Sequence, residues 1–300
     1  MASAAAIRIG VSGWRYAPWR GSFYPKDLPH RAELEYAARA FPSLEINGSF
    51  YSLQSPSSWQ AWYEATPEQF VFAVKGPRYL THMLRLRNVK KPLANFFACG
   101  IFRLREKLGP ILWQLPPNLP FDADQLAAFF DLLPRDLTEA AALARKREAF
   151  MRGKTALGID VNRPLRYAME VRHESFRDPG FVRLLRKHRI ALVIAETAGR
   201  WPMLQEVTTD FVYLRLHGDK ELYRSGYSAA ALARWAAVLK AEAGAKPGRR
   251  ARDVYCYFDN TDEKLRAPID AKALMKRLGV RWPGMPATRT AAGSRQSAAR

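Results

Sequence analysis

The sequence has few cysteines and no long apolar stretch. Only two of its 300 residues are cysteines, Cys99 and Cys256, and their spacing matches no zinc or redox motif. We therefore expect two buried free thiols. No segment approaches the roughly 18 uninterrupted apolar residues of a membrane span. The start of the chain also lacks the charged and long apolar regions of a signal peptide. These absences predict a cytoplasmic protein with no membrane partner.

Acidic residues are scarce relative to basic ones. The 28 Asp and Glu residues face 48 Lys and Arg residues, which gives a formal net charge of +20. Such a surface attracts polyanions, so nucleic acid is one candidate partner. Much of the excess lies in two basic segments, 145–154 and 246–252, and in a tail from Pro283 to Arg300. The charge alone therefore does not locate a functional site.

Two peripheral segments stand apart from the rest of the chain. The tail is rich in Ala, Gly, Ser, Thr and Arg and has almost no large apolar residue, so we expect residues 284–300 to be disordered after a domain over 1–283. The segment Thr138–Ala156 is predicted to be an extra, surface-exposed helix.

Eight short β-like runs alternate with helical patterns along the chain. The runs are Ile7–Ser12, Ser43–Asn47, Phe70–Lys75, Ile111–Leu115, Arg166–Val171, Ala191–Ala195, Phe211–Leu216 and Val254–Asp259. Most are continuously apolar over four or five residues, as buried parallel strands are. The alternation implies parallel pairing through crossover helices. Eight such units in this length predict a single α/β barrel of the (β/α)₈ TIM type, and an open doubly wound sheet is the competing architecture.

Several helices carry specific boundary signals. These are a capping box at Asp122 before Leu126–Leu133, an N-cap at Asp178 before Phe181–His188, a cap at Ser228 before Ala229–Ala243, and Pro268 opening a last helix that ends before Gly279.

Strand parity predicts which side chains point into the barrel, because successive side chains alternate between the helix-facing side and the interior. The polar residues with inward parity are Ser12, Glu45, Asn47, Lys75, Gln114, Glu170, Arg172, Tyr213, Arg215, His217, Tyr255, Tyr257 and Asp259. Most lie at the C-terminal ends of their runs, whereas the N-terminal ends are mostly apolar. Barrel enzymes place their active sites at that C-terminal face.

These residues favour an enzyme that acts on a polar or anionic small molecule by general acid–base chemistry. We assign the catalytic roles to Glu45 and Glu170 as the acid/base pair, to Lys75, which could also form a Schiff base, and to His173 and His217 as assisting groups. The expected substrate-binding residues are Trp14, Tyr16, Asn47, Tyr51, Arg78, Gln114, Arg172, Arg215, Tyr257, Asp259 and Asn260. The sequence identifies no cofactor and no metal site.

Other interpretations remain open. The inward charges could form a purely structural network. The aromatic residues of the first loops could form a lid or satellite core instead of stacking on a ligand. A nucleic-acid-binding or metal-dependent phosphodiester-processing protein is the alternative function, with Glu45, Glu170, Glu196, His217 and Asp259 as metal ligands. A third is a non-catalytic binding protein on a barrel scaffold.

Seven motifs also carry a family resemblance. In chain order they are GVSGWRYAPWRGSFYP, LEINGSFY, FAVKGPRYLTH, GPILWQLPP, YAMEVRHESF, YLRLHG and YCYFDNT. They resemble the family of unknown function numbered seventy-two, also called YecE-like, over nearly the whole chain from Ile7 to Trp282. The resemblance implies a fold similar to a TIM barrel and implies no particular reaction. The sequence departs from the family pattern near Thr138–Ala156 and in the basic tail.

Overall fold

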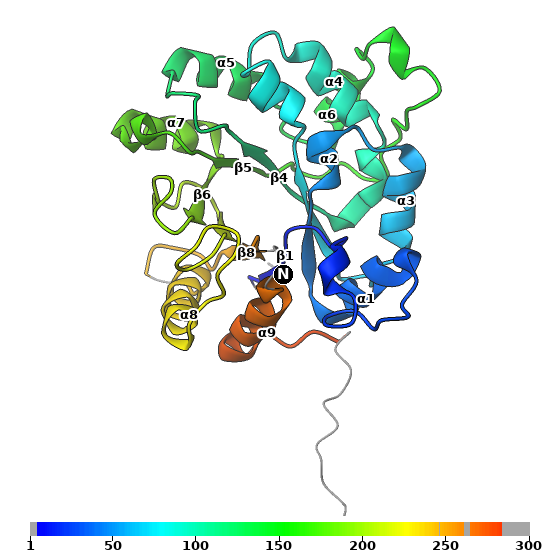
Figure 1. Cartoon of the computed structure of the whole chain (residues 1–300). Coiled ribbons are helices and arrows are strands. Elements are labelled where there is room, and N and C mark those ends of the chain that lie inside the picture. The colour runs from blue at the N-terminus through cyan, green and yellow to red at the C-terminus, as the bar shows by residue number, and fades with distance from the viewer. Residues whose placement is uncertain (1–4, 246, 261–264, 284–300) are drawn as a thin grey trace, which may run out of the picture.

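Eight parallel strands form one nearly closed barrel surrounded by helices (Figure 1). The computed structural model describes residues 5–245, 247–260 and 265–283. The strands are β1 (Ile7–Val11), β2 (Ser43–Ile46), β3 (Val71–Lys75), β4 (Leu108–Gln114), β5 (Tyr167–Glu170), β6 (Ala191–Glu196), β7 (Phe211–Leu216) and β8 (Asp253–Phe258). Each run predicted from the sequence is a strand, and the hydrogen-bonded order β1-β8-β7-β6-β5-β4-β3-β2 confirms the TIM-type barrel.

The seam between β1 and β2 closes the barrel at the C-terminal ends of these strands. Ser12 forms an isolated parallel bridge with Glu45, and the Gly13 amide donates to the Glu45 carbonyl at 2.8 Å. Gly10 makes this approach possible, because a Cβ at that position would lie 1.8 Å from the Ser43 carbonyl oxygen. The seam therefore sets Ser12 directly beside Glu45.

Helices follow most of the strands and cover the outside of the barrel (Figure 1). They are α1 (Glu33–Ala40), α2 (Gly48–Tyr51), α3 (Pro56–Glu64), α4 (Lys90–Ala98), α5 (Ala123–Leu132), α6 (Leu137–Ala144), α7 (Pro179–His188), α8 (Ala229–Ala243) and α9 (Arg266–Leu278). The side chains of Asp122, Asp178 and Ser228 accept from backbone amides of the helices they precede, which confirms the three predicted caps. The last helix starts at Arg266, two residues earlier than Pro268.

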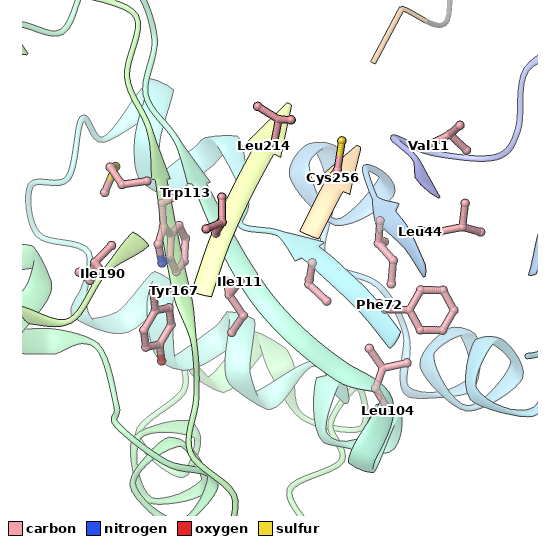
Figure 2. Packing of buried hydrophobic residues seen from close by; sticks show 14 of the residues in the cluster. Val11, Leu44, Phe72, Leu104, Ile111, Trp113, Tyr167, Ile190, Leu214 and Cys256 are labelled. Atoms are coloured by element: carbon pink, nitrogen blue, oxygen red, sulfur yellow. The ribbon is translucent and has the colours of Figure 1, made fainter. Parts of the chain in front are cut away.

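The core has two layers that follow the predicted parity. Between strands and helices, alternate strand residues such as Leu44, Phe72 and Trp113 are fully buried, and Figure 2 shows this layer from Val11 on β1 to Cys256 on β8. A second cluster fills the barrel interior: Ala73, Leu112, Ala168, Ala191, Val193, Ala195, Phe211, Tyr213, Tyr255 and Tyr257. Burial of each large side chain contributes about 1.5–3 kcal/mol. Both cysteines are free and buried, as expected.

The segment predicted as an extra surface helix, Thr138–Ala156, contains one α-helix with a buried and an exposed face. α6 occupies Leu137–Ala144, and its buried residues Leu137, Ala140, Ala141 and Ala144 fall on one face that packs on α4. The other face of α6 and most of residues 145–154 are exposed, as expected, but the helix ends at Ala144, so its predicted extension to Ala156 was wrong. The predicted disordered tail, 284–300, lies outside the described residues. Within the described ranges, no helix has the length and apolar character needed to cross a bilayer.

Candidate functional site

Arg215 lies at the centre of an ionic cluster at the C-terminal end of the barrel. Its side chain projects inward from β7 and is 0% exposed. It contacts Glu45 of β2 in a bidentate manner, with Nη2 to Oε1 at 2.8 Å and Nε to Oε2 at 3.1 Å. Nη1 donates to Glu170 of β5 at 2.5 Å, and Nη2 donates to Asp259, which follows β8, at 2.9 Å. One guanidinium thus joins three carboxylates from three different strands.

The Glu45 carboxylate is fully occupied by protein groups. Ser12 Oγ and Arg215 Nη2 both donate to its Oε1. Tyr213 OH donates to Oε2 at 2.6 Å, and Asn47 Nδ2 supports Ser12 by donating to its hydroxyl at 2.8 Å. A carboxylate held by this many donors is fixed in a single orientation.

His217 completes the deep part of the cluster. It is fully buried, its Nδ1 lies 3.0 Å from Asp259 Oδ2, and its Nε2 lies 3.8 Å from Glu170 Oε2. Its ring packs edge-on against Tyr223 with centroids 5.3 Å apart. Two carboxylates therefore flank an imidazole in a site from which solvent is largely excluded.

Arg172, on the loop after β5, adds a second positive charge beside Glu170. Its Nε donates to Glu170 Oε1 at 2.8 Å and its Nη2 to Tyr223 OH at 3.2 Å. The guanidinium also lies over the ring of Trp201 at 3.9 Å from the centroid, a cation–π geometry. Arg172 is only 9% exposed, so its plane is held by aromatic groups rather than by water.

Lys75 differs from the two arginines because the described residues give it no ion pair. It ends β3, is 7% exposed, and its Nζ lies 4.1 Å from the centroid of the Phe50 ring. His82 packs edge-on against the same ring at 5.1 Å. A buried ammonium on an aromatic face, without a carboxylate, is an energetically costly arrangement.

The pKa shifts differ between the carboxylates, which are held ionised, and the two bases Lys75 and His82, which lose protons more readily than usual. Burial would raise the pKa of Glu170, but Arg215 and Arg172 outweigh it and hold that pKa well below its usual range. The pKa of Asp259 is likewise lowered, chiefly by Arg215 against the effect of burial. By contrast, burial and then Arg215 lower the pKa of Lys75 to about 8, and burial with Lys75 and Arg172 lowers that of His82 to about 4. The carboxylates are thus fixed as anions, whereas Lys75 titrates near neutral pH.

Gln114 and Asn47 lie at the same end with unused acceptors. Gln114 ends β4 in register with Glu170, and its buried Oε1 has no hydrogen-bond partner among the described residues. Asn47 Oδ1 is buried and unpartnered in the same sense. Buried acceptors without partners cost free energy, and they are available to donors of a ligand.

Other predicted site residues lie apart from the cluster. His173 caps the short 3₁₀ helix Glu174–Arg177, with its Nδ1 accepting from the Ser175 amide. Trp14 packs edge-on against Trp62 in the outer core. Tyr257 is fully buried, and its hydroxyl pairs with that of Ser43 at the start of β2.

Four further residues are held at the periphery. The Tyr16 hydroxyl donates to the Ser12 carbonyl at 2.6 Å, beside the seam. Asn260 donates to Asp270 of α9, which anchors the end of β8. Tyr51 is 70% exposed on α2, and Arg78 is exposed at the start of the π-helical turn Tyr79–Met83.

Trp201 and Tyr223 were missed by the sequence interpretation. Both lie on irregular loops, after β6 and β7, where no strand parity applies. Tyr223 has φ 62°, a left-handed conformation that non-glycine residues rarely adopt, and its amide donates to the His217 carbonyl. Ser12 and Tyr213 had the correct inward parity, so their contact with Glu45 follows the predicted geometry.

Glu196, one of the carboxylates considered as a metal ligand, points away from the cluster. Its Oε2 accepts from Trp235 Nε1 on α8 at 2.6 Å, and its Oε1 lies 3.3 Å from Arg234. Over the residues that the structure describes, no group of three or more His, Cys, Asp or Glu side chains is arranged to hold a metal ion.

Comparison with known proteins agrees with the resemblance carried by the motifs. The sequence model of the family described as "Protein of unknown function DUF72" matches residues 8–294. The chain belongs to the DUF72 family. Similar curated proteins are UPF0759 protein YunF of Bacillus subtilis (strain 168), 29% identical over 116 residues, and UPF0759 protein YecE of Escherichia coli (strain K12), 28% identical over 149 residues. These matches cover 37% and 49% of this chain and only 40% and 52% of the relatives' lengths.

Solved structures of other DUF72 proteins share the barrel. A DUF72 family protein from Thermotoga maritima MSB8 superposes with a TM-score of 0.69 at 25% identity, covering 91% of this chain and 99% of that one. Another from Enterococcus faecalis V583 gives a TM-score of 0.68 at 17% identity, with 92% and 96% covered, which concerns the fold alone.

Proposed function

We propose that this DUF72 protein is an enzyme that binds a small anionic molecule at the C-terminal face of its barrel and transfers a proton through Lys75. The observation that carries the proposal is the isolation of the Lys75 ammonium. It is 7% exposed and lies on Phe50, while the three nearby carboxylates are already paired with Arg215. An anion placed beside Lys75 would supply the missing counter-charge.

The titration of Lys75 suits proton transfer. With a pKa of about 8, roughly a tenth of the amine is unprotonated at pH 7, against less than a thousandth for an ordinary lysine. General acids and bases work best when their pKa lies near the operating pH. The proposal therefore transfers the proton-moving role from Glu45 and Glu170 to Lys75, because those carboxylates are committed to Arg215 and Glu170 is held ionised.

Neighbouring groups suit the binding of a polar anion. Arg172 lies at the periphery of the cluster between Trp201 and Tyr223, and its planar guanidinium matches carboxylate or phosphate oxygens. The unpartnered oxygen of Gln114 can accept from a hydroxyl or amine of the ligand. Nucleic-acid binding through the basic surface remains a prediction from composition, and no contact in the cluster favours it.

A thermal-shift screen tests the proposal. The probes are 2-oxo acids and dicarboxylates, each applied to the wild type and to Lys75→Met at pH 7.5. A ligand at a hundred times its Kd stabilises by about 2.7 kcal/mol, which raises the Tm of a chain of this size by about 4 °C. Lys240→Met is the matched control, because Lys240 is an exposed lysine on α8.

The expected result is a shift that Lys75→Met abolishes and Lys240→Met retains. A shift that survives Lys75→Met unchanged would contradict the proposal. So would a panel in which no anion stabilises the wild type.

A further inference from the structure

The N-terminal end of the barrel, opposite the candidate site, contains a cavity of about 820 Å³. Its walls include residues from the starts of several strands, among them Arg8 of β1, Val71 of β3, Leu108 of β4 and Phe211 of β7. The volume falls within the range of small-molecule sites, roughly 300–1,000 Å³. In most barrels this face contributes to stability rather than to ligand binding, so a ligand site here would be unusual.

The lining is strongly basic, and only part of that charge is neutralised. Six lysine and arginine side chains line the cavity against two carboxylates. Arg8 and Arg166 pair with Asp253 at 3.6 and 2.6 Å, and Arg163 pairs with Asp160 at 2.6 Å.

Three lining cations remain without a carboxylate within 4.0 Å among the residues described: Arg135, Lys187 and Arg189. Arg135 is held in place by donating to the His188 carbonyl at 2.7 Å. The other two, Lys187 and Arg189, flank His188 in the sequence, and all three cations are exposed.

His188 itself is a buried polar group without a complete set of partners. It is 6% exposed and lines the cavity, and its Nε2 has no hydrogen-bond partner among the described residues. Its Nδ1 lies 3.5 Å from Arg135 Nη2 and 3.6 Å from Asp131 Oδ1, and these two contacts hold the ring through Nδ1. An unpaired buried nitrogen is costly unless a ligand or water meets it.

The lining also contains apolar and aromatic side chains. Val71, Leu165, Phe211 and Tyr255 line the cavity, with Arg166 over the Phe211 ring at 5.3 Å and Arg8 over the Tyr255 ring at 5.4 Å. A ligand that fills the cavity can therefore contact both cationic and apolar side chains.

We propose that this cavity is a second binding site, for a phosphomonoester that carries an aromatic or apolar group. Arg135, Lys187 and Arg189 would neutralise the phosphate dianion. The apolar lining would hold the organic part. The site is independent of the chemistry proposed for Lys75, which lies at the other end of the barrel.

A helix-capping role explains less of this arrangement. Lys187 and His188 lie in the last turn of α7, where positive charge stabilises the helix. Arg135, from the segment between α5 and α6, takes part in this role by donating to the His188 carbonyl at the end of α7. The capping role does not require a cavity beside these cations.

Calorimetric titration with phenyl phosphate at low salt tests the proposal. The test variant is Lys187→Gln combined with Arg189→Asn. Asn tolerates the left-handed conformation of Arg189 (φ 55°), so the fold should be kept. The charge-matched control is Arg31→Gln combined with Lys240→Gln, two exposed cations far from the cavity in sequence. Lys75→Met is a third variant, which separates the two faces of the barrel.

We expect the test variant to bind phenyl phosphate about tenfold more weakly, and the control and Lys75→Met to bind within about twofold of the wild type. Inorganic phosphate should bind the wild type about tenfold more weakly than phenyl phosphate, because it leaves the apolar lining unfilled.

Absence of phenyl phosphate binding to the wild type, or equal weakening in test and control variants, would overturn the inference. Loss of binding in Lys75→Met alone would move the phosphate to the C-terminal face, which would support the proposed function and refute this second site. Should the double variant unfold, Lys187→Gln alone is measured, and unchanged binding to it would count against the site.

Discussion

Replacing Lys75 by methionine should stabilise the protein at neutral pH, although it removes the group on which the proposed function depends. The pKa of Lys75 is lowered from its usual 10.5 to about 8, chiefly by burial. That difference corresponds to a cost of about 3 kcal/mol in the folded state at pH 7. Methionine has a similar length, fills the same space beside Phe50 and carries no charge.

The expected gain is smaller than this cost. A volume-conserving substitution in a packed site still costs up to about 1.5 kcal/mol in repacking, here beside Phe50. We therefore expect Lys75→Met to be more stable than the wild type by about 1–2 kcal/mol at pH 7. Residues that are needed for function often lower the stability of the fold, and Lys75 would be an example.

The stability advantage of Lys75→Met over the wild type should decrease as the pH rises. A lysine whose folded pKa lies below its unfolded value penalises folding fully below the folded pKa, and the penalty disappears as the pH rises from about 8 to about 10.5. The advantage of Lys75→Met should therefore be greatest at pH 7 and nearly absent at pH 10.5. Guanidinium unfolding followed by tryptophan fluorescence measures both values, with Lys240→Met as the exposed control. A variant less stable than the wild type at pH 7, or an advantage that grows with pH, would refute the reasoning.

Three other substitutions or reactions have definite expected outcomes. Glu170→Gln breaks a buried ion pair and should lose about 3 kcal/mol in chemical denaturation at pH 7. This deficit shrinks as the pH falls below the unfolded pKa of a glutamate, because the unfolded wild type then binds a proton that the folded state, with its lowered Glu170 pKa, does not. Glu174→Gln, in an exposed pair with Arg177, should lose less than about 0.5 kcal/mol. Glyoxylate with cyanoborohydride at pH 8 should alkylate Lys75 faster than the other lysines in peptide mapping, and uniform labelling would contradict its lowered pKa. Gly10→Ala should destabilise by more than about 3 kcal/mol in the same unfolding assay, because its Cβ would overlap the Ser43 carbonyl; wild-type stability would show that the seam can open.

The sequence predicted the barrel and the inward direction of the side chains in the ionic cluster, because both follow from strand periodicity. Eight apolar runs gave the strand count, and two-residue alternation placed Glu45, Glu170, Arg215 and His217 on the inner face, where they meet. Parity does not report depth along the barrel axis. Tyr257 has the same inward parity, yet its hydroxyl reaches Ser43 at the start of β2.

The remaining errors come from positions where periodicity ends. His173 follows its strand by three residues and caps a short helix, and Trp201 and Tyr223 enter the site from loops. The N-terminal ends of the strands were expected to be mostly apolar. Instead Arg8 of β1 and Arg166, just before β5, face that end and meet Asp253, because charged groups at the rim can pair around one carboxylate.

The filling of the barrel interior explains why the charged cluster can be reached from one end only. Small residues from β3, β5 and β6, such as Ala73 and Ala168, face large ones from β7 and β8, above all Tyr213. The Tyr213 hydroxyl donates to Glu45, so the packed interior continues without a break into the ionic cluster and closes it from below. Arg215 is enclosed at this level by its three carboxylates. A ligand would therefore approach from the loop side, where Arg172 retains some exposure and the ammonium of Lys75 has no counter-charge among the described residues.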